Sequence, residues 1–422
     1  MSQKTPAVRN PDGAITAPTT CLNFNFTGAD EVTRQARRNT EMQLSRATAG
    51  GRGKATDEAS RLRRLGTRPR VGPLLPACER ARRLPQCPLD AYAGVMQFPF
   101  RALMLALCLV PAALAADKSY TIAVIPKGTT HEFWKSIHAG AVKAEQELTA
   151  QGLKVRLFWK GPLREDDRDQ QIQVVENFTA RKVSGIVLAP LDSQALVAPV
   201  ASAAQAGVPT VVIDSDLKSD KQLSFVATDN FKGGQMAGEF LAKQLGGKGN
   251  VILLRYQVGS ASTEAREAGF LDALKSAPGL KLISSDQHSG ATRELCYQAS
   301  QNLLNRYGKE VDGIFCPNET VTIAMTKALR DIGRAGGQVK LVGFDSGMQS
   351  VLDLKNGDVQ ALVVQDPLKM GYLGVMTLVQ HLEGKPVEKR IDTGVSLITK
   401  EGMNDPAMAA LLAPPIAKYL KE

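Results

Sequence analysis

The sequence predicts an α/β protein made of two doubly wound parallel-sheet lobes. From Tyr120 onward, apolar runs of four to seven residues alternate with amphipathic helical patterns. Continuous apolar runs of this length are typical of parallel strands that helices cover on both faces. The alternation forms two successive series, and the second begins after Phe225 and Val226. Because each series can build one covered sheet, we expect two lobes.

The first series predicts four strands and three helices. The strands are expected at residues 121–126, 155–159, 185–189 and 210–213. The helices are expected near residues 131–148, 169–180 and 196–206. Gly207 and Pro209 separate the last helix from the last strand, which is the usual place for such turn residues.

The second series repeats this pattern. Its strands are expected at residues 251–254, 280–284, 313–315 and 340–343. Its helices are expected near residues 233–245, 263–276, 293–306 and 321–332. A glycine-rich stretch at 333–337 separates the last helix from the last strand.

The positive charge of the chain lies outside the expected lobes. The formal net charge is +10, and residues 1–95 hold 16 Lys and Arg against 8 Asp and Glu. Residues 116–422 hold 35 basic and 34 acidic residues, so this part is nearly neutral. The basic composition therefore describes a leader, and we expect no nucleic-acid partner for the folded part.

Residues 96–115 have the layout of a secretory signal peptide. The segment MQFPFRALMLALCLVPAALAA (96–116) has one Arg, a short apolar run and small residues before a cleavage point after Ala115. The run is too short for a membrane span, and Cys108 follows Leu107 where a lipid-anchor signal needs a small residue. The alternative is a buried core helix. We expect export to the periplasm.

Residues 1–95 lack strand or helix periodicity and are rich in Arg, Gly, Pro and Thr. Such composition is typical of a disordered basic leader. We expect translation to start at Met96, or the leader to be removed, so that it is no part of the mature protein. The alternative is a DNA-binding headpiece, but no helix-turn-helix spacing of apolar residues occurs there.

Polar side chains recur directly after the expected strands of both series. In parallel sheets, ligands bind beyond the carboxyl ends of the strands. The polar residues found there are Lys127, Asp214, Ser215, Asn318, Glu319, Asp345 and Gln365. Fixed carboxylates and amides suit the hydroxyls of a sugar, each of which donates and accepts hydrogen bonds. The alternative for any single position is that the side chain caps the next helix.

Eight motifs follow one another with compatible spacing in the part of the chain from Tyr120 to Ser396. They are TIAVIPKGTTHEFW (121–134), GIVLAPLDSQAL (185–196), VPTVVIDSD (208–216), FVATDNFKGGQMAG (225–238), EAREAGF (264–270), IFCPNE (314–319), LVGFD (341–345) and ALVVQDPLKMGYLG (361–374). With these motifs the chain resembles the ribose-type periplasmic sugar-binding proteins of ABC transporters, the type I periplasmic binding protein family.

The resemblance implies a receptor that closes on a small polar ligand, a sugar first of all, and hands it to an inner-membrane ABC permease. It implies a hinge of three crossings near 228–230, 365–367 and 393–395. The N-terminal lobe would comprise 116–228 plus 366–393, and the C-terminal lobe 229–365 plus 394–422. The ligand contacts carried over by matching position are Phe133, Trp134, Asp214, Arg266, Asn318, Asp345 and Gln365. The aromatic pair would stack on the C–H face of a sugar ring.

Several positions depart from the ribose pattern and leave the ligand open. Lys127 stands where a small hydroxyl residue is usual, His131 replaces an amide and Ser215 replaces a second Arg. Ala291 falls where another aromatic would cover the opposite ring face. Lys127 with Arg266 could favour an acidic sugar, and IPK is also similar to receptors of furanose-like signal molecules. Alternatively Lys127 points to solvent or pairs with Asp214, and His131 caps the helix beside it.

We expect no enzyme, cofactor or metal site. The four His residues form no zinc spacing, and GFDSG (343–347) places its Ser one position late for a nucleophile elbow. Cys296 and Cys316 could form a disulfide in an oxidising compartment, but two separate buried thiols are the preferred interpretation. We expect a monomer. The alternatives from other classes are a cytoplasmic ligand-sensing regulator, a receptor for a chemotaxis or sensor-kinase partner, and an enzyme.

Overall fold

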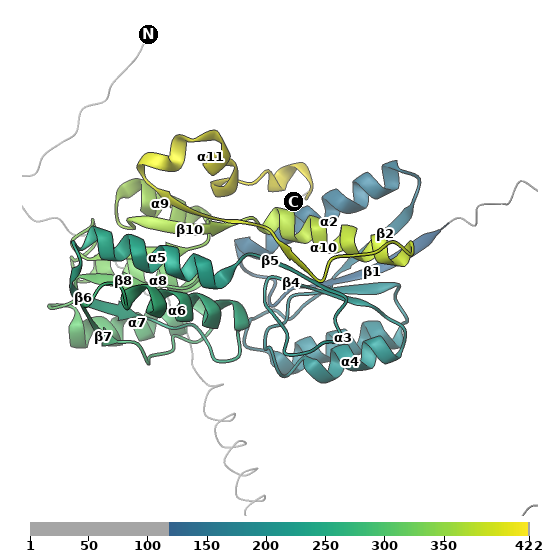
Figure 1. Cartoon of the computed structure of the whole chain (residues 1–422), viewed down its shortest axis with the longest axis horizontal. Helices are drawn as coiled ribbons and strands as arrows, with labels where there is room; N and C mark the ends of the chain where they lie inside the picture. Colours follow the sequence, from purple (N-terminus) through teal and green to yellow (C-terminus); the bar gives the residue numbers. More distant parts are fainter. Residues whose placement is uncertain (1–117, 421–422) are drawn as a thin grey trace, which may run out of the picture. The chain divides into compact units, whose positions relative to one another are not determined.

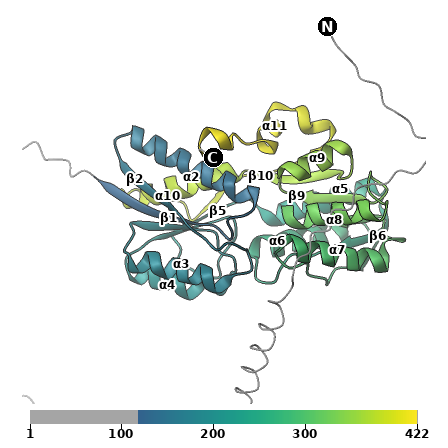
Figure 2. The ribbon, with the colours of Figure 1, turned by 180° about the vertical axis from the view of Figure 1, so that it is seen from behind.

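The computed structural model describes residues 118–420, which form two six-stranded sheets with helices on both faces (Figures 1 and 2). The predicted leader at 1–95 and the predicted signal peptide at 96–115 lie outside the described residues. Within residues 118–420, no helix is both long and apolar enough to cross a membrane.

The first sheet has the strand order β11-β5-β4-β3-β1-β2, and all its neighbours are parallel. We call this sheet and its helices the first lobe. Its strands are β1 (Ser119–Ile125), β2 (Lys154–Trp159), β3 (Gly185–Leu188), β4 (Thr210–Ile213), β5 (Ser224–Ala227) and β11 (Arg390–Asp392). Its helices are α2 (Glu132–Ala150), α3 (Arg168–Ala180), α4 (Val197–Gln205) and α10 (Pro367–Leu382).

The side chains of β1 alternate between two cores, one on each face of the first sheet. Ile122 and Val124 pack with apolar residues of α2 and α10, which lie side by side in Figure 1. Ala123 and Ile125 pack with α3 and α4 on the other face. A strand buried on both faces can be apolar throughout, which is why β1 reads as a continuous apolar run.

The second sheet has the strand order β12-β10-β9-β8-β6-β7. We call this sheet and its helices the second lobe. Its strands are β6 (Lys248–Leu253), β7 (Gly279–Ser284), β8 (Gly313–Phe315), β9 (Lys340–Phe344), β10 (Ala361–Gln365) and β12 (Val395–Thr399). Its helices are α5 (Asn230–Gln244), α6 (Ala261–Leu274), α7 (Arg293–Tyr307), α8 (Glu319–Asp331) and α9 (Met348–Asn356). The chain then forms η1 (Glu401–Asn404), α11 (Pro406–Leu412) and η2 (Ile416–Lys418).

The predicted fold class is confirmed. Each strand and helix predicted in the two series is present, with ends that differ by a few residues. The second sheet has one antiparallel pair, because β12 runs antiparallel to β10. The chain enters β12 from β11 through Thr393 and Gly394, without the helical crossover that a parallel neighbour requires. The apolar spacing did not predict α9, α10, α11, β11 or β12.

The chain passes between the two lobes three times. The passages follow β5, β10 and β11. Two of them are tied together, because the Thr228 hydroxyl donates to the Gly394 carbonyl at 2.9 Å and lies 3.3 Å from the Thr393 hydroxyl. The passages that follow β5 and β11 therefore lie next to each other where they join the two lobes.

Candidate ligand-binding site

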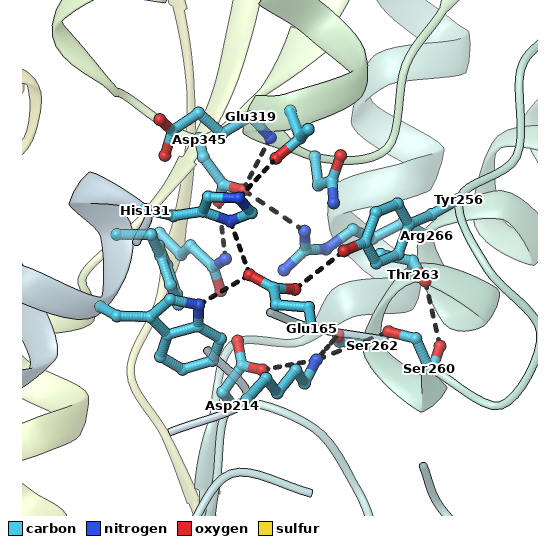
Figure 3. A pocket seen from close by; sticks show the side chains of 16 residues that line it. His131, Glu165, Asp214, Tyr256, Ser260, Ser262, Thr263, Arg266, Glu319 and Asp345 are labelled. Carbon is cyan, nitrogen blue, oxygen red and sulfur yellow. Dashed lines mark hydrogen bonds and ion pairs between the residues drawn. The ribbon is translucent and has the colours of Figure 1, made fainter. Parts of the chain in front are cut away.

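A cavity lies beyond the carboxyl ends of strands from both sheets, where ligands bind in open α/β folds (Figure 3). The space between its side chains, including the part open to solvent, is about 360 Å³. The cavity is lined by Lys127, His131, Phe133, Trp134, Glu165, Asp214, Tyr256, Ser260, Ser262, Thr263, Arg266, Asn318, Glu319, Thr320, Asp345 and Gln365.

The structure brings the predicted site residues together, with the exception of Ser215. The Ser215 side chain is fully buried, and its hydroxyl accepts a hydrogen bond from the Ser262 amide at 3.0 Å. It joins the two lobes beside the cavity and does not line it. Ala291 also lies outside the cavity lining, in a neighbouring groove with Arg164 and Arg293.

Lys127 forms a buried ion pair with Asp214 of the same lobe. The Lys127 Nζ lies 2.9 Å from the Asp214 Oδ2, and both side chains are nearly inaccessible to solvent. The same ammonium donates to the Ser262 hydroxyl of the second lobe at 3.1 Å and lies 3.5 Å from the Ser260 hydroxyl. The sequence left three positions open for Lys127: contact with the ligand, exposure to solvent, or pairing with Asp214. The structure excludes solvent exposure, and it shows the ammonium paired with Asp214 at the wall of the cavity.

Arg266 is the buried cation of the second lobe. Its Nε donates to the Asn230 Oδ1 at 2.8 Å, its Nη1 donates to the Pro317 carbonyl at 2.9 Å, and Nη1 lies 3.7 Å from the Asp345 Oδ2. Its guanidinium also lies over the Phe344 ring, 3.8 Å from the ring centroid. Burial lowers the pKa of Arg266, and the nearby carboxylates of Asp345 and Asp214 oppose that effect.

Asp345 is held by donors from its own lobe. Its carboxylate accepts from the Gln365 amide at 2.7 Å and from the Glu319 backbone N–H at 3.2 Å. Burial raises the pKa of Asp345, while the charge of Arg266 and the hydrogen bond from Gln365 lower it.

Both aspartates adopt a left-handed backbone conformation. Asp214 directly follows β4 with φ of +63°, and Asp345 directly follows β9 with φ of +72°. Such a conformation costs a non-glycine residue about 1–3 kcal/mol, with Asp and Asn the most tolerant types. Residues in such conformations cluster at functional sites, where the contacts of the surrounding fold offset the strain and fix the direction of the side chain.

His131 pairs with Glu165, a residue that the sequence analysis did not identify. The His131 Nδ1 lies 2.6 Å from the Glu165 Oε1, and His131 Nε2 lies 3.5 Å from the Thr320 hydroxyl. Burial acts to lower the pKa of His131, but the hydrogen bond and charge of Glu165 raise it above its ordinary value. His131 occupies the N-cap position of α2, yet its ring makes no capping bond, so the capping alternative is wrong.

The Phe133 and Trp134 rings lie at one wall of the cavity. Their centroids are 5.0 Å apart in an edge-to-face arrangement. Trp134 is buried, and its indole N–H donates to the Glu165 Oε1 at 2.7 Å. The hydrogen bond fixes the orientation of the indole plane, which leaves a rigid apolar wall at the cavity.

Asn318 and Glu319 begin α8 at the opposite wall. The Asn318 side chain caps α8 by accepting from the Val321 amide at 3.1 Å, so Asn318 both caps a helix and lines the cavity. Glu319 is buried next to Asp345. Burial, followed by the charge of Asp345, raises the pKa of Glu319 to about 7.

Three buried side-chain oxygens of the cavity lining have no hydrogen-bond donor aligned with them among the described residues. They are Asp214 Oδ2, Glu319 Oε2 and Gln365 Oε1. Asp214 Oδ2 still has the Lys127 ammonium at 2.9 Å, so it is charge-compensated although the bond geometry is poor. Unpaired buried acceptors are rare in proteins because they cost free energy, so the other two, Glu319 Oε2 and Gln365 Oε1, suit a ligand that brings hydroxyl donors.

Sequence reasoning missed Glu165, Tyr256, Ser260, Ser262, Thr263 and Thr320 among the lining residues. Glu165 belongs to the loop between β2 and α3, several residues past the strand end, within an acidic run that reads as a helix start. Tyr256 comes shortly after the end of β6, so its position beyond a strand end is the signal that identifies it. No local pattern identifies Glu165.

Cys296 and Cys316 are separate buried thiols, as the preferred interpretation expected. Burial raises the pKa of Cys296 to about 12 and that of Cys316 well above its ordinary value, so both behave as apolar core residues. Among residues 118–420, no group of three or more His, Cys, Asp and Glu side chains could hold a metal ion.

Residues 122–386 match the protein family described as the periplasmic binding protein domain. The D-ribose/D-allose-binding protein of Pseudomonas aeruginosa is 32% identical over 290 residues, which cover 66% of this chain and 88% of that protein. A carbohydrate transporter solute-binding protein from Agrobacterium radiobacter, solved with D-arabinose, is 35% identical, with a TM-score of 0.65 over 70% of this chain and 99% of its own.

A further solved structure, an ABC transporter solute-binding protein from Agrobacterium vitis with bound D-fucose, is 33% identical. Its TM-score is 0.66, with 69% of this chain and all of its own chain covered. The family match includes every residue that lines the cavity, and β11 and β12 lie beyond it. The chain belongs to the periplasmic binding protein family.

Proposed function

We propose that this chain is a receptor that captures a neutral monosaccharide, or a closely related polyol, in the cavity between its two lobes. One observation carries the proposal: side chains of both lobes surround buried oxygens of Glu319 and Gln365 that no donor within residues 118–420 satisfies. A sugar hydroxyl can donate to such an acceptor and accept from a neighbouring cation. The relatives that bind ribose, allose, arabinose or fucose support the same ligand class.

The charges of the cavity favour an uncharged ligand. Lys127 is paired with Asp214, His131 with Glu165 and Arg266 with Asp345. Glu319 adds a carboxyl group without a cationic partner of its own. An acidic sugar would therefore find no uncompensated cation, and its carboxylate would lie among four acidic side chains. Lys127 and Arg266 thus orient hydroxyls and do not neutralise a ligand charge.

The aromatic contact is proposed to be one-sided. Phe133 and Trp134 can cover one face of a sugar ring through its C–H groups. Ala291 supplies no ring for the opposite face and lies outside the cavity. The polar contacts of Arg266, Asp345 and Asn318 would then cover that side.

We further propose that the three passages between the lobes act as a hinge, and that the chain delivers its sugar to an inner-membrane ABC permease after export. The proposed lobe boundaries are 116–228 plus 366–393 and 229–365 plus 394–422. The proposed signal peptide is 96–115. Deleting residues 96–115 should leave the protein in the cytoplasm, as fractionation would report, and unchanged periplasmic delivery would contradict the export proposal.

A thermal-shift screen of the full chain tests the ligand. The panel contains D-ribose, D-allose, D-arabinose and D-fucose, together with galactose and its matched acid, galacturonic acid. A ligand that binds only the folded state raises the melting temperature as the logarithm of its excess over Kd. We expect a shift with at least one neutral sugar and none with galacturonic acid. A shift with the acid alone would contradict the proposed ligand class.

A further inference from the structure

Glu165 accepts hydrogen bonds from three side chains that come from different parts of the molecule. Its Oε1 accepts from the Trp134 indole at 2.7 Å and lies 2.6 Å from the His131 Nδ1. Its Oε2 accepts from the Tyr256 hydroxyl at 2.9 Å (Figure 3). Glu165, Trp134 and His131 belong to the first lobe, whereas Tyr256 follows β6 in the second lobe.

The segment 256–259 of the second lobe is docked on loops of the first lobe around this bond. The Gln257 amide donates to the Glu165 carbonyl at 2.8 Å, and the Arg168 guanidinium donates to the Val258 carbonyl at 3.1 Å. The Ser193 backbone N–H donates to the Gly259 carbonyl at 2.9 Å. All of these bonds connect protein groups to protein groups, so none of them requires a sugar.

The protonation states of Glu165 and Tyr256 favour a strong hydrogen bond between them. Burial acts to raise the pKa of Glu165, but the hydrogen bond and charge of His131, the charge of Lys127 and the indole N–H lower it to about 2. Burial and the Glu165 charge raise the pKa of Tyr256 well above its ordinary value, so the phenol keeps its proton. A neutral O–H that donates to a buried carboxylate makes a charge-assisted bond.

We propose that Glu165 is a positioning residue that couples sugar capture to closure of the lobes. Its carboxylate orients Trp134 and His131 at the cavity wall and, through Tyr256, latches segment 256–259 to the first lobe. The coupling to capture rests on the proposed function, whereas the latch stands on protein contacts alone. The latch therefore exists in the sugar-free protein, in which it maintains a population of the closed arrangement.

Hydrogen–deuterium exchange of the full chain without any sugar tests the latch. The informative readout is the backbone amide of Ser193, because it lies in the first lobe and its acceptor, Gly259, lies in the second. In Tyr256→Phe, and in Glu165→Gln, the peptide that contains Ser193 is expected to exchange about tenfold faster than in the wild type.

Tyr297→Phe provides the matched control. Tyr297 also lies in the second lobe and donates to a carboxylate, that of Asp331, within its own lobe. Exchange at Ser193 should be unchanged in this variant. Wild-type exchange rates at Ser193 in Tyr256→Phe would overturn the proposal, as would a Ser193 amide without protection in the wild type. Failure of every sugar in the thermal-shift screen would overturn the proposed function and leave this result unaffected.

Discussion

The two lobes place an aspartate at matching positions but satisfy it in different ways. Asp214 and Asp345 each follow the strand third from the hinge-side end of its sheet, and both are left-handed. The ammonium that pairs with Asp214 takes its further hydrogen-bond partners, Ser260 and Ser262, from the second lobe. Asp345 is held entirely within its own lobe by Arg266, Gln365 and the Glu319 amide. The second half of the site is thus held within one lobe, whereas the first half takes partners from the other lobe.

The largest expected losses of sugar affinity come from Arg266 and Asp345, which are paired within the second lobe. Arg266→Ala and Asp345→Asn should each weaken sugar binding by about 2–4 kcal/mol, because each removes one partner of a buried, hydrogen-bonded charge pair. The isosteric Asn keeps the left-handed conformation accessible. Asp214→Asn should cost about 1–2 kcal/mol, since Lys127 retains the two serine hydroxyls. Titration calorimetry measures all three, and an equal or larger loss in Asp214→Asn would contradict the contrast between the halves.

The pH dependence of stability should reflect the buried groups with raised pKa values, which are Glu319, His131, Asp345 and Glu267. A group with a raised folded pKa stabilises the native state at low pH and loses that contribution as pH rises. For Glu319, the loss should run from about pH 4.5 to about pH 7 and reach up to about 3 kcal/mol. For His131, the loss begins near pH 6.5 and continues through its raised pKa. Stability measured by urea unfolding should therefore fall between pH 5 and pH 8.

Glu319→Gln should reduce this dependence, and Glu294→Gln, at an exposed position of α7, should leave it unchanged. Urea unfolding of both variants at several pH values measures how the free energy of unfolding depends on pH. An undiminished slope in Glu319→Gln would show that the titrating carboxyl lies elsewhere.

Each lobe also contains one close crossing of two helices at glycine. In the first lobe, a Cβ on Gly371 of α10 would lie 2.0 Å from the Ile137 carbonyl of α2. In the second lobe, a Cβ on Gly234 of α5 would lie 1.9 Å from the carbonyl of Arg266 itself. Gly234→Ala and Gly371→Ala should each cost about 1–3 kcal/mol of stability. Gly234→Ala should weaken sugar binding more than Gly371→Ala, because it displaces the backbone of Arg266, which lines the cavity, whereas Ile137 does not line it.

The smallest effect is expected at Ser262. Ser262→Ala should lower sugar affinity by about 0.5–1.5 kcal/mol and leave the melting temperature of the sugar-free protein nearly unchanged. The reason is that the Ser262 hydroxyl bonds Lys127 and Ser215, both of the first lobe. Ser300→Ala is the control, since the Ser300 hydroxyl bonds the Cys296 carbonyl within α7 and should affect stability alone. The reverse pattern would mean that Ser262 is a folding contact.

The sequence predicted the sheets and the strand-end half of the site for one physical reason. Short apolar runs of strand length precede four of the site residues, which are Asp214, Asn318, Asp345 and Gln365. The local sequence pattern therefore predicts that these residues lie beyond the ends of buried strands. Arg266 came from the family resemblance, because a charged residue inside a helix carries no local signal. Glu165 could not be predicted, since its role depends on a loop that folds back to meet Tyr256 from the other lobe. Whether Lys127 is paired likewise depends on tertiary packing.

Titration calorimetry of the full chain with D-ribose, D-allose, D-arabinose and D-fucose tests the central claim most directly. We predict that at least one of these sugars binds with one site per chain, and that Arg266→Ala and Asp214→Asn both weaken that binding, because the two substitutions lie in different lobes. Absence of binding by all four sugars, or binding that neither substitution weakens, would contradict capture between the lobes.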